Sequence, residues 1–331
     1  MNKQSYTPPY ELTSSSLNSV EQICERLGQL KADATRTAVP KLRRGNRIKT
    51  IQASLEIEGN TLNVQQVTAI LSGQRVLGQP REIQEVRNAF NAYEQMGNFS
   101  PCVCKDLLAA HGLLMTGLVD ESGKFRSGGV GVFRGTKVAH LAPPAKRVPQ
   151  LIAQLLAWLQ NSQEHPLITS SVFHYELEFI HPFVDGNGRI GRLWQTLILN
   201  RWQPLFSLLP IESVIRDRQK DYYAALGQSD TDGNATVFVE FMLNAIAQAI
   251  KEIVLETDQV TDQVSDQVGK IVKMLRRGPR SASELMSELS LSHRPSFRQN
   301  YLRPALDAGI IEMTRPDKPQ AKNQKYKLKT K

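Results

Sequence analysis

Hydrophobic positions recur every three or four residues over most of this chain, which is the spacing of one face of an α-helix. The first such face consists of Leu17, Val20, Ile23, Cys24, Leu27 and Leu30. The same spacing predicts helices over 14–31, 42–58, 63–71, 81–96, 106–118, 148–158, 168–180, 188–199 and 237–255. The sequence therefore predicts a mainly α fold.

A glycine-rich segment, residues 123–144, interrupts the helical pattern. It contains two short β-prone runs, 130–133 and 137–141, and closes with Pro143-Pro144. Glycine and proline in these positions are typical of the turns around short strands. We therefore expect a β-hairpin that forms a flap on an otherwise helical body.

The C-terminal part of the chain has a different pattern. The repeat TDQV, TDQV, SDQV fills residues 257–268, and its valines predict either a linker that continues into a helix or a small interaction helix. Helical patterns follow over 267–277, 283–291 and 294–308, and alternating residues predict strands over 310–314 and 325–329. Three short helices and a two-stranded wing describe a winged helix.

These patterns divide the chain into four parts. We expect an N-terminal helical arm over residues 1–40, whose first 13 residues are loose, and a helical domain over 41–255. A linker over 256–266 and the winged-helix domain over 267–331 follow. More than one domain agrees with a length of 331 residues.

Charge is concentrated in the last of these parts. The formal net charge is +9, but residues 270–331 hold 15 Lys and Arg against 5 Asp and Glu, so the preceding residues sum to −1. Only the C-terminal part therefore suggests a polyanionic partner. The chain has no apolar run of about 18 residues and no signal-peptide pattern, so we expect a cytoplasmic protein without membrane contact. Three cysteines, Cys24, Cys102 and Cys104, argue against a disulfide framework.

One segment, residues 181–192, combines a histidine, glycines and arginines in the sequence HPFVDGNGRIGR. Pro182 disfavours helix for the residue before it, so the preceding helix should end at His181 and leave it on a turn. Gly186 and Gly188 flank Asn187 and allow backbone N–H groups to converge at the start of the next helix. We therefore expect an anion site at that helix N-terminus.

The charged side chains of this segment indicate a polyphosphate ligand. Arg189 and Arg192 are three residues apart and share one face of the helix, and two guanidinium groups beside an anion site suit a polyphosphate. Asp185 supplies an oxygen ligand of the kind that Mg²⁺ uses beside phosphates. Because the ordinary pKa of a histidine lies near neutral, His181 is placed to deprotonate a nucleophile.

The segment resembles the signature of the Fic family, HPFx(D/E)GNGRxxR, at every signature position. The resemblance implies a Fic helical bundle with a β-hairpin flap and a protein adenylyltransferase that uses ATP and Mg²⁺. It implies that His181 is the general base for a target hydroxyl and that Phe183 anchors the loop in the core. Asp185 would hold Mg²⁺. The anion hole for the α- and β-phosphates would consist of Gly186, Asn187 and Gly188, and the β- and γ-phosphates would bind Arg189 and Arg192.

A second, shorter motif resembles the inhibitory motif of the family, (S/T)xxxE(G/N). The chain has Ser54, Glu58 and Gly59 at the matching positions, at the end of the helix expected over 42–59. This placement resembles the subgroup whose inhibitory helix precedes the Fic core. There Glu58 would pair with Arg192 and remove a γ-phosphate ligand, since a carboxylate competes strongly for a guanidinium group.

The resemblance also places other residues. The hairpin would clamp a target segment by strand addition. Either Tyr222 or Tyr223 would stack on adenine, although a core aromatic is an open alternative, and Asp230 is a weaker adenine candidate. We interpret His111, His140 and His174 as structural or surface groups.

The winged helix matches C-terminal domains of some Fic proteins. Its candidate DNA contacts are Arg294, Arg298 and Arg303 on the expected recognition helix, and Lys318, Lys322 and Lys325 in or beside the wing. Binding to another protein and simple solvation of these charges stay open.

The expected function is an autoinhibited transfer of AMP from ATP to Tyr, Thr or Ser hydroxyls of proteins, the chain itself included, with release of pyrophosphate. One alternative is the reverse reaction, in which Glu58 directs water to remove AMP from a modified protein. Another is a DNA-binding regulator whose Fic pocket senses a nucleotide. The signature also leaves transfer of other nucleotides or of phosphocholine open.

Overall fold

The computed structural model of the chain describes residues 6–33, 39–129, 131–134, 137–307, 309–319, 321 and 323–329. The chain divides into two compact units. The first unit comprises Met1–Gln29 with Pro40–Lys251, and the C-terminal unit comprises Leu30–Val39 with Glu252–Lys331. The four-part division expected from the sequence stays a prediction. Among the described residues, no helix has the length and apolar character that crossing a membrane requires.

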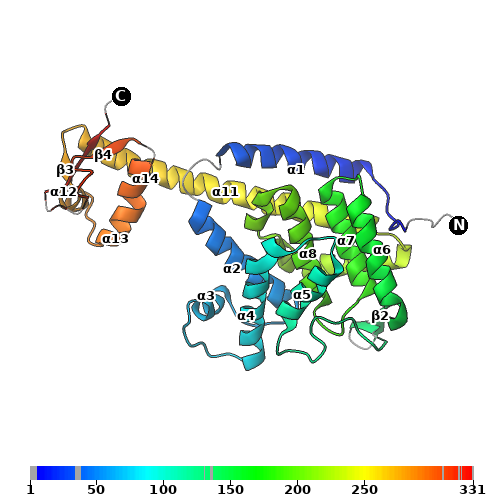
Figure 1. Ribbon diagram of the computed structural model, residues 1–331. Coiled ribbons are helices and arrows are strands. Elements are labelled where there is room, and N and C mark those ends of the chain that lie inside the picture. The colour runs from blue at the N-terminus through cyan, green and yellow to red at the C-terminus, as the bar shows by residue number, and fades with distance from the viewer. Residues whose placement is uncertain are drawn as a thin grey trace. The chain divides into compact units, whose positions relative to one another are not determined.

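The first unit is built almost entirely of helices (Figure 1). Helix α1 (Ser14–Asp33) begins in it, and its 3₁₀ turns are η1 (Met96–Asn98), η2 (Ala145–Arg147) and η3 (Pro204–Leu208). Its remaining helices are α2 (Val39–Ile57), α3 (Val64–Leu71), α4 (Pro80–Gln95), α5 (Cys104–Met115), α6 (Val148–Asn161), α7 (Pro166–Ile180), α8 (Asn187–Trp202), α9 (Ile211–Asp217) and α10 (Gln219–Asp232). The mainly α fold expected from the sequence is confirmed, although the hydrophobic pattern did not predict α9 and α10.

Helices α7 and α8 form the centre of this unit and lie side by side (Figure 1). Both are buried around nearly their whole circumference, which explains why their sequences lack a polar face. The hydroxyls of Ser170 and Ser171 both return to the carbonyl of Leu167, so these polar groups are satisfied within α7. The two helices therefore hold the segment between them, residues 181–186, on a rigid support.

The glycine-rich segment contains the predicted β-hairpin. Strand β1 (Gly131–Arg134) pairs antiparallel with β2 (Lys137–Leu141), with a register shift between Val132 and Phe133. A shift of this kind is a β-bulge, which bends the strand and increases its twist. The hairpin is therefore confirmed, and residue 130, the first of the predicted strand, lies outside the described residues.

The N-terminal arm differs from the loose segment that the prolines suggested. Its described part, residues 6–13, makes specific hydrogen bonds to the start of α11 (Thr236–Leu275). The carbonyl of Pro9 accepts from the Ala235 N–H at 2.8 Å, and the Glu11 N–H donates to the Thr236 hydroxyl at 2.9 Å. Pro8 and Pro9 thus exclude helix without leaving the arm unattached.

Helix α11 runs as one helix of 40 residues where the sequence suggested two helices and a linker. The physical reason is that no glycine or proline occurs between residues 236 and 268, so nothing in the repeat interrupts the backbone hydrogen bonds. The repeat over 257–268 is therefore helical.

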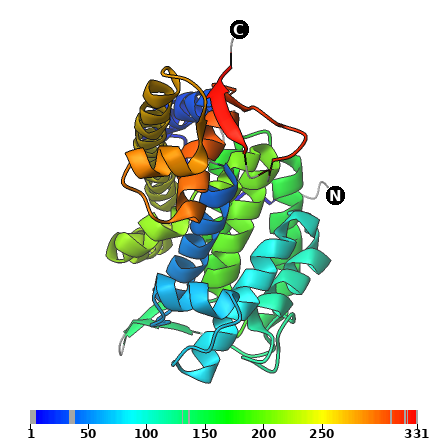
Figure 2. The same cartoon turned by 90° about the vertical axis from the view of Figure 1, so that its left-hand side faces the viewer.

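The C-terminal unit has its own core, which includes Ile271, Leu285, Phe297 and Tyr326. Its helices are α12 (Ala282–Glu288), α13 (Arg294–Phe297) and α14 (Arg303–Asp307), with a π-helical turn, η4 (Arg298–Leu302), between the last two. Strands β3 (Arg280–Ser281), β4 (Ile311–Met313) and β5 (Lys325–Leu328) form an antiparallel sheet in the order β3-β5-β4, beside these helices (Figure 2).

This arrangement agrees with the predicted winged helix and adds a third strand, β3, that the sequence did not indicate. The helix expected over 294–308 is interrupted by the π-turn, which ends at Leu302, two residues before Pro304. Proline lacks the N–H that would continue the regular ladder, and a wider turn accommodates this loss.

Candidate active site

The end of α7 places His181 beside the start of α8. The helix ends at Ile180, and His181 follows it with φ 50° and ψ 60°, in the left-handed region. The sequence predicted this end from Pro182. A left-handed conformation costs a non-glycine residue about 1 kcal/mol, and such residues gather at functional sites. The ring Nδ1 of His181 lies 3.4 Å from the carbonyl oxygen of Glu178.

The loop after His181 is closed by the side chain of Asn187. Its Oδ1 accepts from the Phe183 N–H at 3.0 Å, and its Nδ2 donates to the Phe183 carbonyl at 2.9 Å. The ring of Phe183 is fully buried, which is the location expected of a loop anchor. Asn187 therefore shapes the loop with its side chain, and its backbone belongs to the first turn of α8.

His111 supports the same loop from α5. Because its Nδ1 accepts from the Gly123 N–H at 3.0 Å, its Nε2 carries the proton and donates to the Asp185 carbonyl at 2.9 Å. The ring stacks on Phe183 with centroids 3.6 Å apart. Burial lowers the pKa of His111 to about 4, so the imidazole is neutral. The interpretation of His111 as a structural group agrees with these contacts, and His140 has its side chain outside the described part of the chain.

Arg126 connects the loop to the base of the hairpin. Its guanidinium group donates to the His181 carbonyl at 2.7 Å and to the Ile180 carbonyl at 3.3 Å. The same group donates to the Gly128 carbonyl at 2.8 Å and to the carbonyl of Pro143. Arg126 is 3% exposed, so one buried cation fixes the His181 backbone against both ends of the hairpin segment.

A side chain at either of two glycines at the start of α8 would displace a neighbouring side chain. Gly186 has φ 87°, and a Cβ there would lie 2.6 Å from the Met115 sulfur. A Cβ at Gly188 would collide with the carboxylate of Glu58. The first turn of any helix has N–H groups without intrahelical acceptors and carries a partial positive charge. Glu58 thus places an anionic group at the helix N-terminus where the sequence predicted an anion site.

The same carboxylate binds Arg192. The Nη2 of Arg192 lies 2.8 Å from the Glu58 Oε1 and 2.9 Å from the Ser54 carbonyl, while its Nε donates to the Ser54 hydroxyl at 3.1 Å. Ser54 lies on α2, and Glu58 follows the last residue of that helix. The two are four residues, or about one turn, apart, so both face Arg192. Arg192 is 2% exposed, and its Nη1 finds no hydrogen-bond acceptor within the described part of the chain. The structure therefore brings together the residues that the two motifs predicted.

Arg189, the other arginine of the motif, is held by two carboxylates. Its Nη2 lies 2.8 Å from the Asp185 Oδ1, and its Nη1 lies 3.2 Å from the Glu85 Oε1 on α4. Arg81, also on α4, lies 3.1 Å from the second oxygen of Asp185. Arg189 is 4% exposed. Three carboxylates, Glu58 among them, thus form ion pairs with three guanidinium groups around the start of α8.

The donor set suits a magnesium ion that arrives with a nucleotide. The described residues contain no cluster of three side chains able to hold a metal by themselves. Asp185 has a side chain that is 37% exposed, which leaves it accessible to an ion. Mg²⁺ is commonly held by one or two carboxylates together with substrate phosphates and water. Asp185 fits that role.

The adenine candidates occupy different environments. Tyr222 is 1% exposed, its ring packs on Phe238, and its hydroxyl lies 3.2 Å from the Nε2 of His174. In this structure Tyr222 is thus a core aromatic, which is the alternative that the sequence left open. Tyr223 is only partly buried and retains exposed surface. Asp230 accepts a hydrogen bond from the Tyr175 hydroxyl at 3.1 Å. Contact of Tyr223 or Asp230 with adenine stays a prediction.

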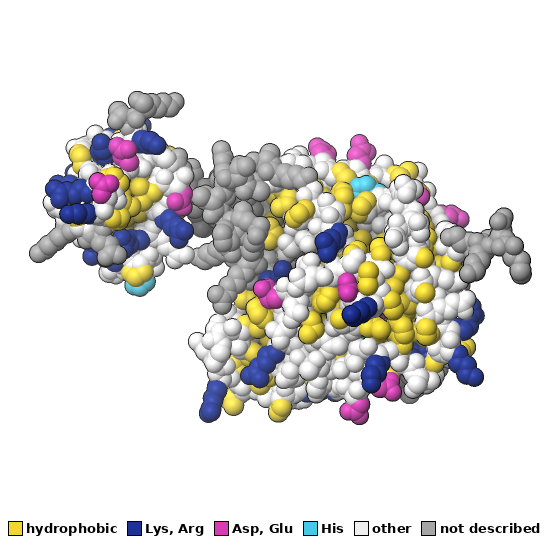
Figure 3. Space-filling view, in the orientation of Figure 1, with side chains coloured by type: hydrophobic (Ala, Val, Ile, Leu, Met, Phe, Trp, Pro, Cys, Tyr) yellow, Lys and Arg dark blue, Asp and Glu magenta, His cyan; other side chains and the backbone are white. Residues whose placement is uncertain are grey.

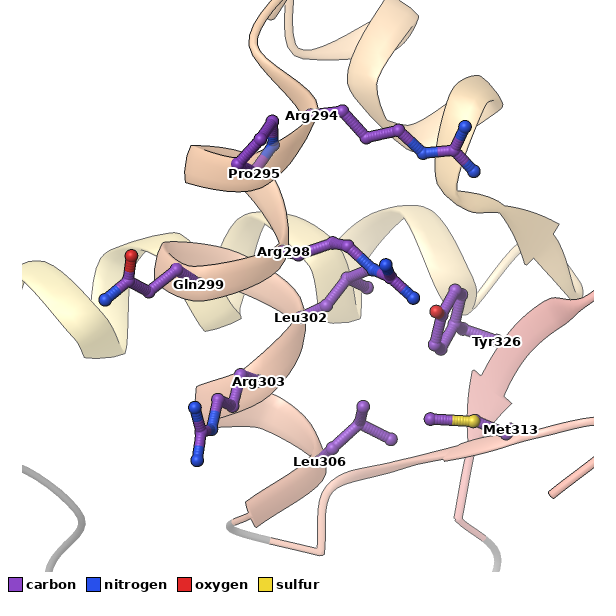
Figure 4. Close-up of a pocket in the computed structure, with 9 residues that line it drawn as sticks. All are labelled: Arg294, Pro295, Arg298, Gln299, Leu302, Arg303, Leu306, Met313 and Tyr326. Atoms are coloured by element: carbon purple, nitrogen blue, oxygen red, sulfur yellow. The ribbon is translucent and has the colours of Figure 1, made fainter. Parts of the chain in front are cut away.

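Basic side chains gather on the C-terminal unit, at the left of Figure 3. Arg294, Arg298 and Arg303 are exposed and line one open pocket of about 710 Å³ between the helical segment 294–307 and the wing. Figure 4 shows its apolar floor, formed by Leu302, Leu306, Met313 and Tyr326. The three candidate DNA contacts thus share one site. Lys318 is exposed, Lys325 lies in β5, and Lys322 lies outside the described residues.

Sequence reasoning missed four residues of the site. It did not indicate Arg81, Glu85 or Arg126, and it gave His111 no connection to the loop. The first two lie on a helix that the pattern did predict, about 100 residues before their partners, and no local motif marks them. One available signal was Arg126 itself, a charged residue within the glycine-rich segment.

Comparisons with known proteins agree with this site. Residues 101–199 match the sequence model of the Fic/DOC family, and residues 266–329 match that of the filamentation induced by cAMP protein Fic-like, C-terminal domain. Protein adenylyltransferase fic-1 of Caenorhabditis briggsae is 30% identical over 221 residues, which are 62% of this chain and 41% of that protein. Protein adenylyltransferase Fic of Aedes aegypti is 29% identical over 68% of this chain and 46% of that protein. The chain spans less than half the length of these curated relatives.

Solved structures extend the comparison to the whole chain. A Fic family protein from Desulfovibrio desulfuricans G20 is 56% identical, and the match covers 98% of this chain and 99% of that one, with a TM-score of 0.74. Fic-1 from C. elegans is 23% identical over 74% of each chain, with a TM-score of 0.58, a likeness of fold alone.

Proposed function

The chain belongs to the Fic family, and we propose that it transfers AMP from ATP to hydroxyl side chains of proteins, its own included, and that Glu58 holds this activity low. The relatives named protein adenylyltransferase support the reaction. The observation that carries the regulation is the Glu58 carboxylate, which binds Arg192 at 2.8 Å directly above Gly188.

In the proposed reaction, His181 accepts the proton of a Tyr, Thr or Ser hydroxyl. The hydroxyl oxygen forms a bond to the α-phosphorus of ATP, the bond from that phosphorus to the bridging oxygen breaks, and pyrophosphate leaves. The N–H groups at the start of α8, around Gly186, Asn187 and Gly188, stabilise charge on the phosphates. Arg189 and Arg192 bind the terminal phosphates with their guanidinium groups.

Asp185 would hold the Mg²⁺ of the nucleotide. When bound, that ion would neutralise negative charge on the phosphates. The protein contributes the position of the carboxylate. His111 donates to the backbone carbonyl of Asp185, and Arg81 and Arg189 bind its two side-chain oxygens. These contacts fix Asp185 before a nucleotide arrives, which reduces the reorganisation that binding requires.

Inhibition follows from competition for the same donors. While Glu58 binds Arg192 and covers Gly188, a γ-phosphate would place a second anion in the same position. Replacement of Glu58 by glycine removes this anion, and because Glu58 follows Ile57, the last residue of α2, no residue inside the helix is changed.

The proposal is tested by mass spectrometry of the Glu58→Gly protein incubated with ATP, Mg²⁺ and cell lysate. We expect AMP on hydroxyl side chains, at a level more than about tenfold above the wild-type protein, since one charge-assisted hydrogen bond no longer competes with phosphate. The matched control is Glu58→Gly combined with His181→Ala. Transfer of a different group would contradict adenylyl transfer, and equal labelling by the control would contradict the role of His181.

The same preparation tests the reverse reaction. In that alternative Glu58 directs a water molecule to the phosphorus of an AMP-modified side chain. Wild-type protein would then remove AMP from a target that the Glu58→Gly variant has modified, and Glu58→Gly would not. A modified target that stays intact with the wild-type protein argues against hydrolysis.

We infer a second, separate candidate function, DNA binding by the C-terminal unit. The observation that favours it is that Arg294, Arg298 and Arg303 line a single pocket beside the wing. Fluorescence anisotropy with labelled duplex DNA and the full chain tests it. We expect affinity to fall steeply as salt rises and to drop about tenfold or more in Arg294→Ala/Arg298→Ala.

A matched control has the same loss of charge elsewhere on the unit. Lys273→Ala/Arg276→Ala removes two exposed cations that do not line the pocket and should change DNA affinity much less. Binding of an acidic protein instead of DNA, or equal losses in both double variants, would argue against DNA recognition at this site.

A further inference from the structure

Glu85 occupies a position toward Arg189 that parallels the position of Glu58 toward Arg192. Glu58 directly follows α2 and Glu85 lies on α4, both ahead of the motif in the chain, and both bind a nearly buried guanidinium group of α8. The Glu85 Oε1 lies 3.2 Å from the Arg189 Nη1. Its side chain is 13% exposed, so water screens this pair only weakly.

Asn60 connects the two pairs. It follows Glu58 by two residues, it is 6% exposed, and its Nδ2 donates to the Glu85 Oε2 at 2.9 Å and to the Glu82 carbonyl at 3.2 Å. The next residue, Thr61, donates its N–H and its hydroxyl to the Glu82 carboxylate at 2.7 and 2.8 Å. The end of α2 is therefore fastened to α4 at the carboxylate that holds Arg189.

Glu58, Glu85 and Asp185 form ion pairs with Arg81, Arg189 and Arg192 around the start of α8. A further carboxylate, Glu178, also interacts electrostatically with Arg192, so positive charge is not in excess here. A polyphosphate binds best where positive charge is in excess. Removal of Glu58 takes away one negative charge, but Arg189 stays tied to Glu85. Removal of Glu85 takes away a second negative charge and frees an N–H donor of Arg189.

We propose that Glu85 is a second inhibitory carboxylate, which restrains Arg189 as Glu58 restrains Arg192, and that the side chain of Asn60 couples the two. This inference rests on the proposed function, because it concerns the same nucleotide site. A movement of the backbone at the end of α2 that withdraws Glu58 from Arg192 also displaces Asn60, two residues on, and so disturbs the bond between Asn60 and Glu85. Both arginines are then released together.

The experiment is isothermal titration calorimetry with Mg²⁺ and an ATP analogue whose α,β-bridging oxygen is replaced by methylene, so that binding is measured without transfer. We expect Glu85→Gln to bind this analogue about tenfold more tightly than the wild-type protein. AMP, which lacks the β- and γ-phosphates, should bind the two proteins within about twofold of each other. A merely structural role for Glu85 would affect both ligands alike.

Glu94→Gln is the matched control, because Glu94 is exposed near the other end of the same helix and loses the same charge. It should bind both ligands as the wild-type protein does. Equal or weaker analogue binding by Glu85→Gln, with this control unchanged, overturns the proposal. If Glu85→Gln does not fold, Glu85→Asp replaces it, because the shorter side chain draws the carboxylate away from Arg189 and should tighten binding in the same direction.

The coupling is tested by a double-mutant cycle of Glu58→Gly and Glu85→Gln. We expect the two gains in analogue affinity to be non-additive in the presence of Asn60 and additive once Asn60→Ala is introduced. Additive gains in both backgrounds overturn the role of Asn60. If Glu58→Gly binds the analogue more tightly and Glu85→Gln does not, the inhibitory role of Glu85 is refuted and that of Glu58 stands. If no variant binds the analogue, the proposed function fails as well.

Discussion

His181 keeps its left-handed conformation because neighbouring groups hold it there. Arg126 donates to the carbonyls of Ile180 and His181, one on each side of the His181 Cα, and the His181 N–H donates to the Leu177 carbonyl at 3.0 Å. Each of these hydrogen bonds contributes about 1–3 kcal/mol, which exceeds the backbone cost. The candidate base is therefore positioned by contacts to its backbone, which no inspection of the motif alone could indicate.

His111 makes stability depend on pH. Burial lowers its pKa from 6.5 to about 4, so the folded protein binds fewer protons than the unfolded chain at intermediate pH. Stability is therefore fully present above pH 6.5 and falls as pH drops from there toward 4. We expect the wild-type protein to lose about 2 kcal/mol more than His111→Gln between pH 7 and pH 5, measured by urea unfolding at both values. Equal losses would contradict a buried neutral imidazole.

At the scale of elements, the hairpin is connected to the catalytic loop through one side chain. Arg126 spans from the Gly128 and Pro143 carbonyls to the end of α7. Arg126 therefore connects the residues on either side of the hairpin to the loop that carries His181.

Replacement of Arg126 by methionine keeps most of the apolar stem and removes these donors. We expect a loss of about 3 kcal/mol in the free energy of unfolding, since buried carbonyls lose their charged partner. In the Glu58→Gly background, kcat/KM for AMP transfer should also fall. Arg147→Met is the control, because Arg147 is exposed at η2 and should have little effect on either quantity. A large kinetic effect without loss of stability would argue for direct contact of Arg126 with substrate.

The helices and the motif were predictable because both are local. The spacing of apolar residues predicted α7, and Pro182 predicted where it ends. Glu58 and Ser54 were predictable through a second short motif. Glu85 and Arg126 were not, since their partners Arg189 and His181 lie 104 and 55 residues away along the chain. Side-chain pairing across elements depends on the packing of the whole unit, and neither residue type nor spacing specifies it.

At the scale of the whole molecule, the chain divides into two compact units, and among the described residues the C-terminal unit has a hydrophobic core of its own. The core of the C-terminal unit consists of its own residues, such as Ile271, Leu285 and Phe297, and the range 266–329 that matches a separate family model covers them. The apolar pattern predicted this unit, whereas continuity of α11 depends on the absence of a helix breaker before residue 268.

Two compact units should give two separable unfolding events. Phe297 is 1% exposed, and its replacement by alanine should cost the C-terminal unit about 3–5 kcal/mol. Differential scanning calorimetry should show one transition lowered and the transition of the first unit unchanged, with nucleotide binding retained. A single transition that shifts as a whole would show that the two units unfold cooperatively.

The most direct test of the central claim uses ATP labelled at either the α- or the γ-phosphate. We predict that Glu58→Gly incorporates the α-label into protein far faster than the wild-type chain, and that it incorporates no γ-label, which leaves as pyrophosphate. Incorporation of the γ-label would contradict adenylyl transfer, and equal rates for the wild-type and Glu58→Gly proteins would contradict inhibition by the carboxylate over Gly188.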